Sequence, residues 1–305
     1  MRRTLAVFAV TMATMFASAT VGLNAQAAPD SAHSNGHNQV VRDPSGQLVT
    51  TGHGTHTAGQ QKAKKDPPPA ATTAAGAGTG CAYYATSLYY CHAGAMQYVT
   101  SDGAYMSTPV QSPAVSSSDN HSLAELAVES ADGKQIIEIG WRIYRPDGPT
   151  PRLFIYHWVN GVGKCYNSGC GFVPSGSSGI TPGMALTPSS TPVQFAIEYF
   201  QGNWWYGYNG NWFGYLPGSE WGGTFVKTGL VQLFGEVSST VARPCTDMGN
   251  GYLGTNASAA AVTGVGYYNS TTATSLSKGT VDDSTLYDSQ ITSANSFRYG
   301  GPGAC

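Results

Sequence analysis

The chain of 305 residues carries 15 basic and 17 acidic side chains, and only 10% of its residues are charged. This near balance excludes a strong electrostatic field, so we expect neither a nucleic acid nor an anionic membrane as a partner. Abundant glycine and tyrosine, together with six cysteines that all lie beyond position 80, instead indicate an all-β protein with disulfides formed in an oxidising compartment.

Residues 1–27 have the pattern of a secretory signal peptide. Arg2 and Arg3 precede a mostly apolar run over residues 5–23, and small residues provide a cleavage site after Ala27. Polar residues within the run disfavour the alternative, a membrane anchor. We therefore expect the protein to be secreted.

Residues 28–80 have the composition of a propeptide or disordered linker. The segment is polar and passes through a basic KAKK stretch into DPPPAATTAAGAGTG at residues 66–80. Such a composition cannot bury enough apolar surface to fold alone. We expect this segment to be dispensable for the fold and to be removed during maturation.

A motif in this segment resembles the histidine segment of subtilisin-family serine proteases. Residues 51–59 read TGHGTHTAG, which would make His53 a general base. A catalytic histidine needs an aspartate and a serine on a folded scaffold, but no βαβ pattern and no matching serine segment are present. We interpret the match as coincidence. For the same reason, His33, His37, His53 and His56 are assigned to a solvated tail rather than to a metal site.

From residue 81 to residue 305 the sequence predicts an antiparallel β-sandwich or barrel. Segments rich in tyrosine and tryptophan alternate with glycine, proline and asparagine turns, without a sustained helical period. The cysteine spacing permits several connectivities. We expect the disulfides Cys81–Cys91, Cys165–Cys170 and Cys245–Cys305.

Four of the six glutamates have unremarkable patterns. Glu125 and Glu129 alternate with apolar residues in SLAELAVES, and Glu198 does so in VQFAIEYF, which predicts solvated strand faces. Glu220 follows a proline-glycine turn and is expected in a loop.

Glu138 and Glu236 have a different setting. Glu138 lies in QIIEIGWRIYR on a strand face that is neither plainly solvated nor plainly apolar, and Gly140 leaves room for a backbone or a ligand. Glu236 lies in VQLFGEVSSTV on the face that carries Phe234, directly after Gly235. The pattern is consistent with a shared site in a sheet cleft.

Six segments resemble, in the same order, the neprosin family of glutamic peptidases. The resemblance covers about residues 103–269, and the segments CYNxxCGFV and GNWW are specific as a set. The matching segments are EIGWRI (residues 138–143), PRLFIYHW (151–158), CYNSGCGFV (165–173), GNWWYGYNGNWFGYLP (202–217), FGEV (234–237) and TDMGNG (246–251).

This resemblance implies a two-sheet antiparallel β-sandwich and an acid-active endopeptidase that cleaves peptides or proteins next to proline. Glu138 and Glu236 fall on the family's catalytic positions, and neither a cofactor nor a metal is implied. Two features depart from the family. The usual WGGEV reads LFGEV at residues 233–237, and a short segment replaces the larger folded pro-domain.

Two carboxyl groups that face one cleft cannot both ionise easily, so one keeps its proton over a wider pH range. The ionised member would take a proton from water, and the protonated member would assist the scissile carbonyl and the leaving amine. Activity should therefore fall in alkaline solution. The sequence leaves open which glutamate is the acid.

The aromatic residues of the segment 202–217 are the expected substrate contacts. Trp204, Trp205, Tyr206 and Tyr215 could present flat surfaces to a proline ring. The same rings could stack on a sugar, as in a carbohydrate-binding β-sandwich or a glycoside hydrolase, or could pack inside the sandwich. A carbohydrate-binding module would not need the two glutamates to converge, whereas a peptidase would.

Overall fold

The structure is a computed structural model that describes residues 39–51, 68, 80–84, 87–164, 166–176 and 178–305. Over these residues, the regular elements are β-strands and two short 3-10 helices, η1 (Arg145–Asp147) and η2 (Gly218–Trp221). The predicted all-β class is confirmed. No helix within the described ranges is long and apolar enough to cross a membrane.

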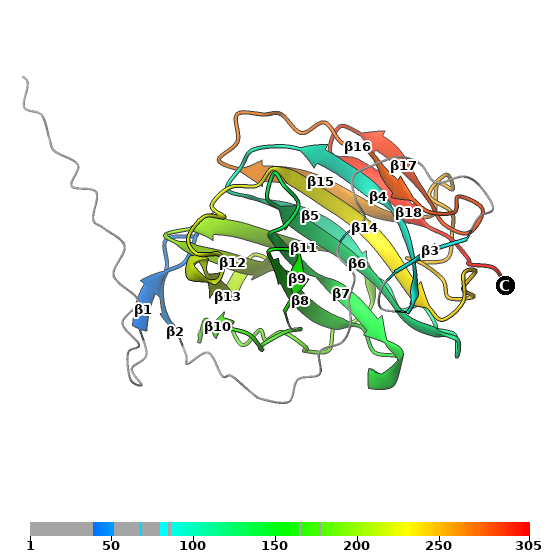
Figure 1. The fold of residues 1–305 in the computed structure, drawn as a ribbon, viewed down its shortest axis with the longest axis horizontal. Helices are drawn as coiled ribbons and strands as arrows, with labels where there is room; N and C mark the ends of the chain where they lie inside the picture. The colour runs from blue at the N-terminus through cyan, green and yellow to red at the C-terminus, as the bar shows by residue number, and fades with distance from the viewer. Residues whose placement is uncertain (1–38, 52–67, 69–79, 85–86, 165, 177) are drawn as a thin grey trace, which may run out of the picture. The chain divides into compact units, whose positions relative to one another are not determined.

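The strands of residues 80–305 form two antiparallel sheets (Figure 1). Sheet I contains β3 (Ala82–Tyr83), β4 (Tyr89–Tyr98), β6 (Asp119–Glu129), β7 (Ile136–Tyr144), β8 (Arg152–Val159), β9 (Val162–Gly163), β14 (Leu230–Ser239) and β16 (Ser277–Val281). Its order is β16-β4-β14-β6-β7-β8-β9, with β3 paired to β4. Strands that are far apart in the sequence are therefore neighbours at its centre.

Sheet II is built from the remaining strands of this part of the chain. They are β5 (Gly103–Val110), β10 (Val173–Pro174), β11 (Ser189–Phe200), β12 (Asn203–Tyr208), β13 (Asn211–Pro217), β15 (Ala260–Tyr268), β17 (Asp288–Ser293) and β18 (Ser296–Gly300). Their order is β10-β13-β12-β11-β5-β15-β18-β17.

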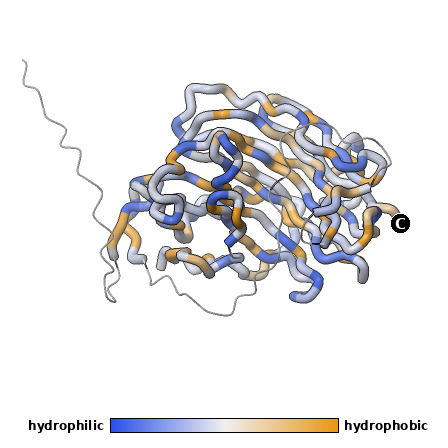
Figure 2. The backbone as a smooth tube through the Cα atoms, viewed as in Figure 1, coloured by the Kyte–Doolittle hydropathy of each residue, from blue (hydrophilic) through white to orange (hydrophobic). Residues whose placement is uncertain are grey.

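The main hydrophobic core lies between the two sheets, so the fold is the expected sandwich. Ile137 and Trp141 of sheet I belong to the same buried cluster as Phe195 and Ile197 of sheet II. Figure 2 shows hydrophobic positions distributed along the strands of both sheets. Because successive side chains of a strand point to opposite faces, the residues between these core positions face away from the core.

The outer face of sheet I is also buried. This face carries a second apolar cluster, which is separate from the main core. Gly140 allows the central strands to approach closely, since a Cβ atom at this position would lie 2.0 Å from the carbonyl oxygen of Ala124 on β6. The room that Gly140 provides is therefore taken by a neighbouring backbone. The second cluster consists of Leu123, Ala127, Ile136, Phe154, Tyr156, Trp158, Tyr166 and Phe234.

Part of the segment expected to be disordered forms an antiparallel hairpin, β1 (Gln39–Arg42) with β2 (Leu48–Thr51). Val49 is buried beside Trp205 and Tyr215, and the backbone N–H of Gly176 donates to the carbonyl oxygen of Thr50 at 2.8 Å. The expectation of disorder is corrected for these residues. The composition argument considered only the surface that the segment could bury by itself, whereas here it packs against a sheet formed by later residues.

Two of the expected disulfides, Cys81–Cys91 and Cys245–Cys305, are confirmed. Cys170 is also disulfide-bonded, and its predicted partner Cys165 lies outside the described residues. The histidine motif of residues 52–59, and the four tail histidines set aside with it, also lie outside the described residues.

Candidate active site

Glu138 and Glu236 lie on the same face of sheet I, the one turned away from the main core. On β7, Glu138 alternates with the core residues Ile137 and Ile139, and on β14 Glu236 alternates with Leu233 and Val237. We call this surface the glutamate face. It carries Glu125, Glu129, Glu138 and Glu236 on strands β6, β7 and β14.

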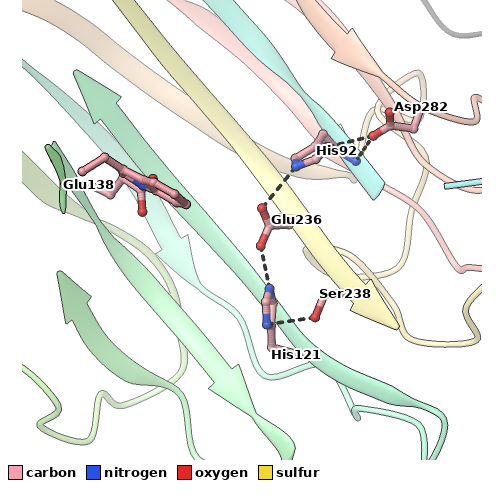
Figure 3. A network of polar contacts seen from close by, with 7 residues as sticks. His92, His121, Glu138, Glu236, Ser238 and Asp282 are labelled. Carbon is pink, nitrogen blue, oxygen red and sulfur yellow. Dashed lines mark hydrogen bonds and ion pairs between the residues drawn. The ribbon is translucent and has the colours of Figure 1, made fainter. Parts of the chain in front are cut away.

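One strand, β6, separates the two predicted catalytic glutamates. Glu138 is in register with Ala127, whereas Glu236 is in register with Leu123, four positions further along β6. With about 4.8 Å between strands and about 3.4 Å per residue, their Cα atoms lie about 17 Å apart. Figure 3 shows Glu138 set apart from the contacts around Glu236. The two residues share a face without being neighbours in the sheet, so the register alone does not bring their carboxyl groups to one point, as a peptidase that uses both would require.

A third carboxyl group, that of Glu125, lies between them. It is in register with Gly140 on one side and with Phe234 on the other, and its side chain has no exposed surface. The predicted solvated face is wrong for Glu125, and also for Glu129 and Glu198, which are buried as well. Strand alternation separates two faces but does not show whether each is exposed, and here the glutamate face is buried and carries an aromatic cluster of its own.

Both carboxylate oxygens of Glu236 contact a histidine (Figure 3). Nε2 of His92 lies 3.1 Å from Oε2, and Nε2 of His121 lies 2.6 Å from Oε1. The contacts continue outward, because Nδ1 of His92 lies 2.7 Å from Oδ2 of Asp282 and Nδ1 of His121 lies 3.1 Å from Oγ of Ser238. All five residues are buried.

His92 is held as a cation in this network. A neutral imidazole has one donor nitrogen and one acceptor nitrogen, but both nitrogens of His92 face carboxylates. Burial by itself would lower the pKa of His92, but the charge of Asp282 and the hydrogen bonds to Asp282 and Glu236 raise it to about 10. The positive charge next to Glu236 favours the ionised carboxylate.

Glu138 has different surroundings. The indole Nε1–H of Trp158 donates to Oε1 of Glu138 at 2.9 Å, and Glu138 is fully buried. Its register partner on β8, Tyr156, packs against Trp158 and Tyr166 with ring centroids 5.4 and 4.7 Å apart. An apolar, aromatic setting of this kind favours the protonated carboxyl group.

His92 and His121 are functional candidates that the sequence interpretation missed. In the sequence, the only signal for either histidine is its position within its strand, which places the side chain on the glutamate face. Their meeting at Glu236 depends on the pairing of β4 and β6 with opposite sides of β14. Among the described residues, no group of three His, Cys, Asp or Glu side chains is arranged to hold a metal ion.

The four predicted substrate-binding rings do not lie on the glutamate face. Trp204 and Tyr206 belong to the main core, and Trp205 and Tyr215 pack with Val49 of the hairpin. Burial and, secondly, the charge of Glu138 raise the pKa of Tyr206 well above its usual value. The structure gives all four rings a packing role, and their contact with substrate stays a prediction.

Glu129 allows a test of the electrostatics of this face. Burial, aided by the charge of Glu138 and opposed by a hydrogen bond from Gln232, raises the pKa of Glu129 from 4.5 to about 8. Because the folded state holds this proton more tightly than the unfolded state, its stabilising effect is complete below pH 4.5 and is lost as the pH rises through 8.

Glu129→Gln should remove this loss. We expect the variant to gain about 2 to 4 kcal/mol of unfolding free energy over wild type at about pH 9, and little at about pH 4. Urea titrations at both pH values measure the difference. Asp147→Asn, which changes an exposed carboxyl group, is the matched control and should show no such trend. A gain for Glu129→Gln that does not depend on pH would contradict the prediction.

The fold and the site together define a β-sandwich protein with buried acid–base groups gathered on one sheet face. The Neprosin family model matches residues 118–302, more than half of the chain, and the chain therefore belongs to the Neprosin family. Its class is that of a peptidase. The resemblance seen in the sequence is confirmed, and the matched range includes Glu125, Glu138 and Glu236.

Similar solved structures include two peptidases and a transglycosylase. Scytalido-glutamic peptidase with a transition-state analogue inhibitor is 12% identical at a TM-score of 0.42, covering 70% of this chain and 99% of that one. SCP-B, a member of the Eqolisin family of peptidases in complex with a tripeptide, is 12% identical at a TM-score of 0.37, covering 70% of this chain and 99% of that one. Apo Crh5 transglycosylase is 14% identical at a TM-score of 0.31, covering 55% of this chain and 67% of that one. Likenesses this distant do not assign chemistry. No curated protein matches the chain in sequence.

Proposed function

We propose that this protein is a secreted, acid-active glutamic endopeptidase in which Glu138 and Glu236 are the catalytic acid–base pair. The observation that carries the proposal is that these two glutamates, which the family resemblance implies are catalytic, share one buried face in contrasting electrostatic surroundings. Glu236 lies against the cationic His92, whereas Glu138 lies among aromatic rings.

In the proposed reaction, the ionised carboxylate takes a proton from a water molecule while the water oxygen bonds to the scissile carbonyl carbon. The protonated carboxyl group hydrogen-bonds the carbonyl oxygen while keeping its proton, and then transfers that proton to the leaving nitrogen as the C–N bond breaks and the carbonyl group re-forms. The products are a carboxylic acid and an amine. Activity requires one protonated carboxyl group, so it should fall as the solution becomes alkaline.

Cleavage next to proline and secretion are parts of this proposal. The segments that resemble the neprosin family support the proline preference, and the signal-peptide pattern of residues 1–27 supports secretion. The carbohydrate alternative has less support, because the matching family model is that of a peptidase family, while the buried rings Trp204, Trp205, Tyr206 and Tyr215 offer an open stacking platform neither to a sugar nor to a proline ring.

The proposal is tested with the secreted, processed protein and a mixed peptide library, with the products identified by mass spectrometry. We expect cleavage next to proline, faster at about pH 4 than at about pH 8. A library of the same sequences with alanine in place of proline is the control. Equal cleavage of the two libraries would reject the proline preference. No peptide cleavage at any acidic pH, with binding or cleavage of a polysaccharide, would overturn the proposed function in favour of the carbohydrate alternative.

A further inference from the structure

We propose that His92, Asp282 and His121 are positioning residues that make Glu236 the base of the reaction and leave Glu138 as the acid. This inference rests on the proposed glutamic peptidase function. It adds a role for each member of the pair and a physical cause for those roles.

The sheet brings these side chains together from separate strands. His92 on β4 is directly opposite Glu236, and His121 on β6 is opposite Ser238, one position further along the same face of β14. Asp282 follows β16, and its carboxylate accepts hydrogen bonds from both the backbone N–H and the ring of His92, each at 2.7 Å. His92 is therefore held in place by its ring and by its backbone.

The hydrogen atoms of this network can be assigned from its contacts. His92 donates from Nδ1 to Asp282 and from Nε2 to Glu236, which makes it an imidazolium. His121 can stay neutral, with Nε2–H donating to Glu236 and Nδ1 accepting the hydroxyl hydrogen of Ser238. Glu236 thus accepts at both oxygens. Because both hydrogen bonds are stronger to the charged carboxylate than to a protonated carboxyl group, the network stabilises the ionised form.

Several other titratable groups face this network, from strands on both sides of β14. The negative charges among them oppose ionisation of Glu236. The imidazolium of His92 is within hydrogen-bond distance and outweighs them, because Coulomb energy falls with distance. The charged and titratable groups on this face are Tyr90 on β4, Glu125 and Glu129 on β6, Glu138 and the cation Arg142 on β7, and Asp282 after β16.

An ionised Glu236 can enter the reaction only as the proton acceptor. It takes the proton of the attacking water, and the water oxygen forms the new bond to the carbonyl carbon. We assign the proton that the leaving nitrogen needs to the other member of the pair, because that member begins the reaction protonated whereas the network around Glu236 disfavours its protonated form. Glu138, which accepts the indole hydrogen bond of Trp158 in an aromatic setting, is that donor.

The pH dependence of kcat/KM in the processed enzyme tests these roles. Its acidic limb should report ionisation of the base, and its alkaline limb should report the acid. Without the neighbouring cation, Glu236 is harder to ionise, so His92→Gln should move the acidic limb up by about one pH unit and leave the alkaline limb in place. Asp282→Asn, which weakens the cation indirectly, should move it in the same direction by less.

Asp288→Asn is the matched control, because Asp288 also pairs with a cation, Lys278, but at the exposed surface. It should leave both limbs in place. An acidic limb that is unmoved in folded His92→Gln would overturn the inference. A shift of the alkaline limb alone would show that Glu236 is the acid and Glu138 the base. Full activity of Glu236→Gln would instead reject the proposed function, so the two failures can be told apart.

A measurement on the unmodified protein avoids any dependence on variants that fail to fold. Nitrogen-15 NMR of labelled histidine should show both ring nitrogens of His92 protonated at about pH 8, where an ordinary histidine is neutral. His121 should show one protonated nitrogen. A neutral His92 at that pH would overturn the inference.

Discussion

Glu138→Gln and Glu236→Gln are each expected to lower kcat for peptide hydrolysis by at least about 10³-fold, since each removes one proton-transfer group. Glutamine keeps the size and shape of glutamate but does not titrate in this range. Steady-state kinetics at acidic pH measure the loss. Glu198→Gln is the matched control, because it makes the same change at a buried glutamate on sheet II, away from the glutamate face. It should retain the activity of wild type.

The two variants should differ in stability. Glu138→Gln can still accept the hydrogen bond of Trp158 and should unfold like wild type. Glu236→Gln leaves the cationic His92 without one of its two carboxylates, and should lose about 1 to 3 kcal/mol of unfolding free energy. Urea unfolding of both variants provides the comparison. A folded Glu138→Gln or Glu236→Gln that keeps wild-type turnover would remove that residue from the mechanism.

The chain that retains residues 28–80 is expected to be inactive, and removal of this segment is expected to activate it. In the full chain, neither Glu138 nor Glu236 has any exposed surface, so a peptide cannot contact either carboxyl group without a rearrangement. If fewer than about one molecule in a hundred is open, the gain in activity on processing is at least about 100-fold.

This prediction can be checked by expressing the chain with a specific protease site inserted after Gly80. Peptide hydrolysis is measured before and after cleavage, and mass spectrometry confirms the cut. The matched control carries the same protease site after Ala27, so that cleavage leaves residues 28–80 in place and should not activate. Equal turnover before and after cleavage at Gly80 would show that the carboxyl groups are reached without processing.

The sequence by itself determined the fold class and the strand face on which Glu138 and Glu236 lie. These features depend on local information. Turn residues and period-2 alternation define strands and their faces over a few positions, and family segments such as EIGWRI and FGEV mark the two glutamates directly.

Only the tertiary structure decided what covers each face and which side chains meet there. Glu125 has the alternation of a solvated strand, yet it has no exposed surface and shares its face with an apolar, aromatic cluster. His92 and Glu236 are 144 residues apart in the chain and meet because β4 pairs with β14 in one register. A shift of one residue in that pairing would place the two side chains on opposite faces of the sheet and break the contact. Such registers are set by the packing of the whole sheet rather than by any one strand.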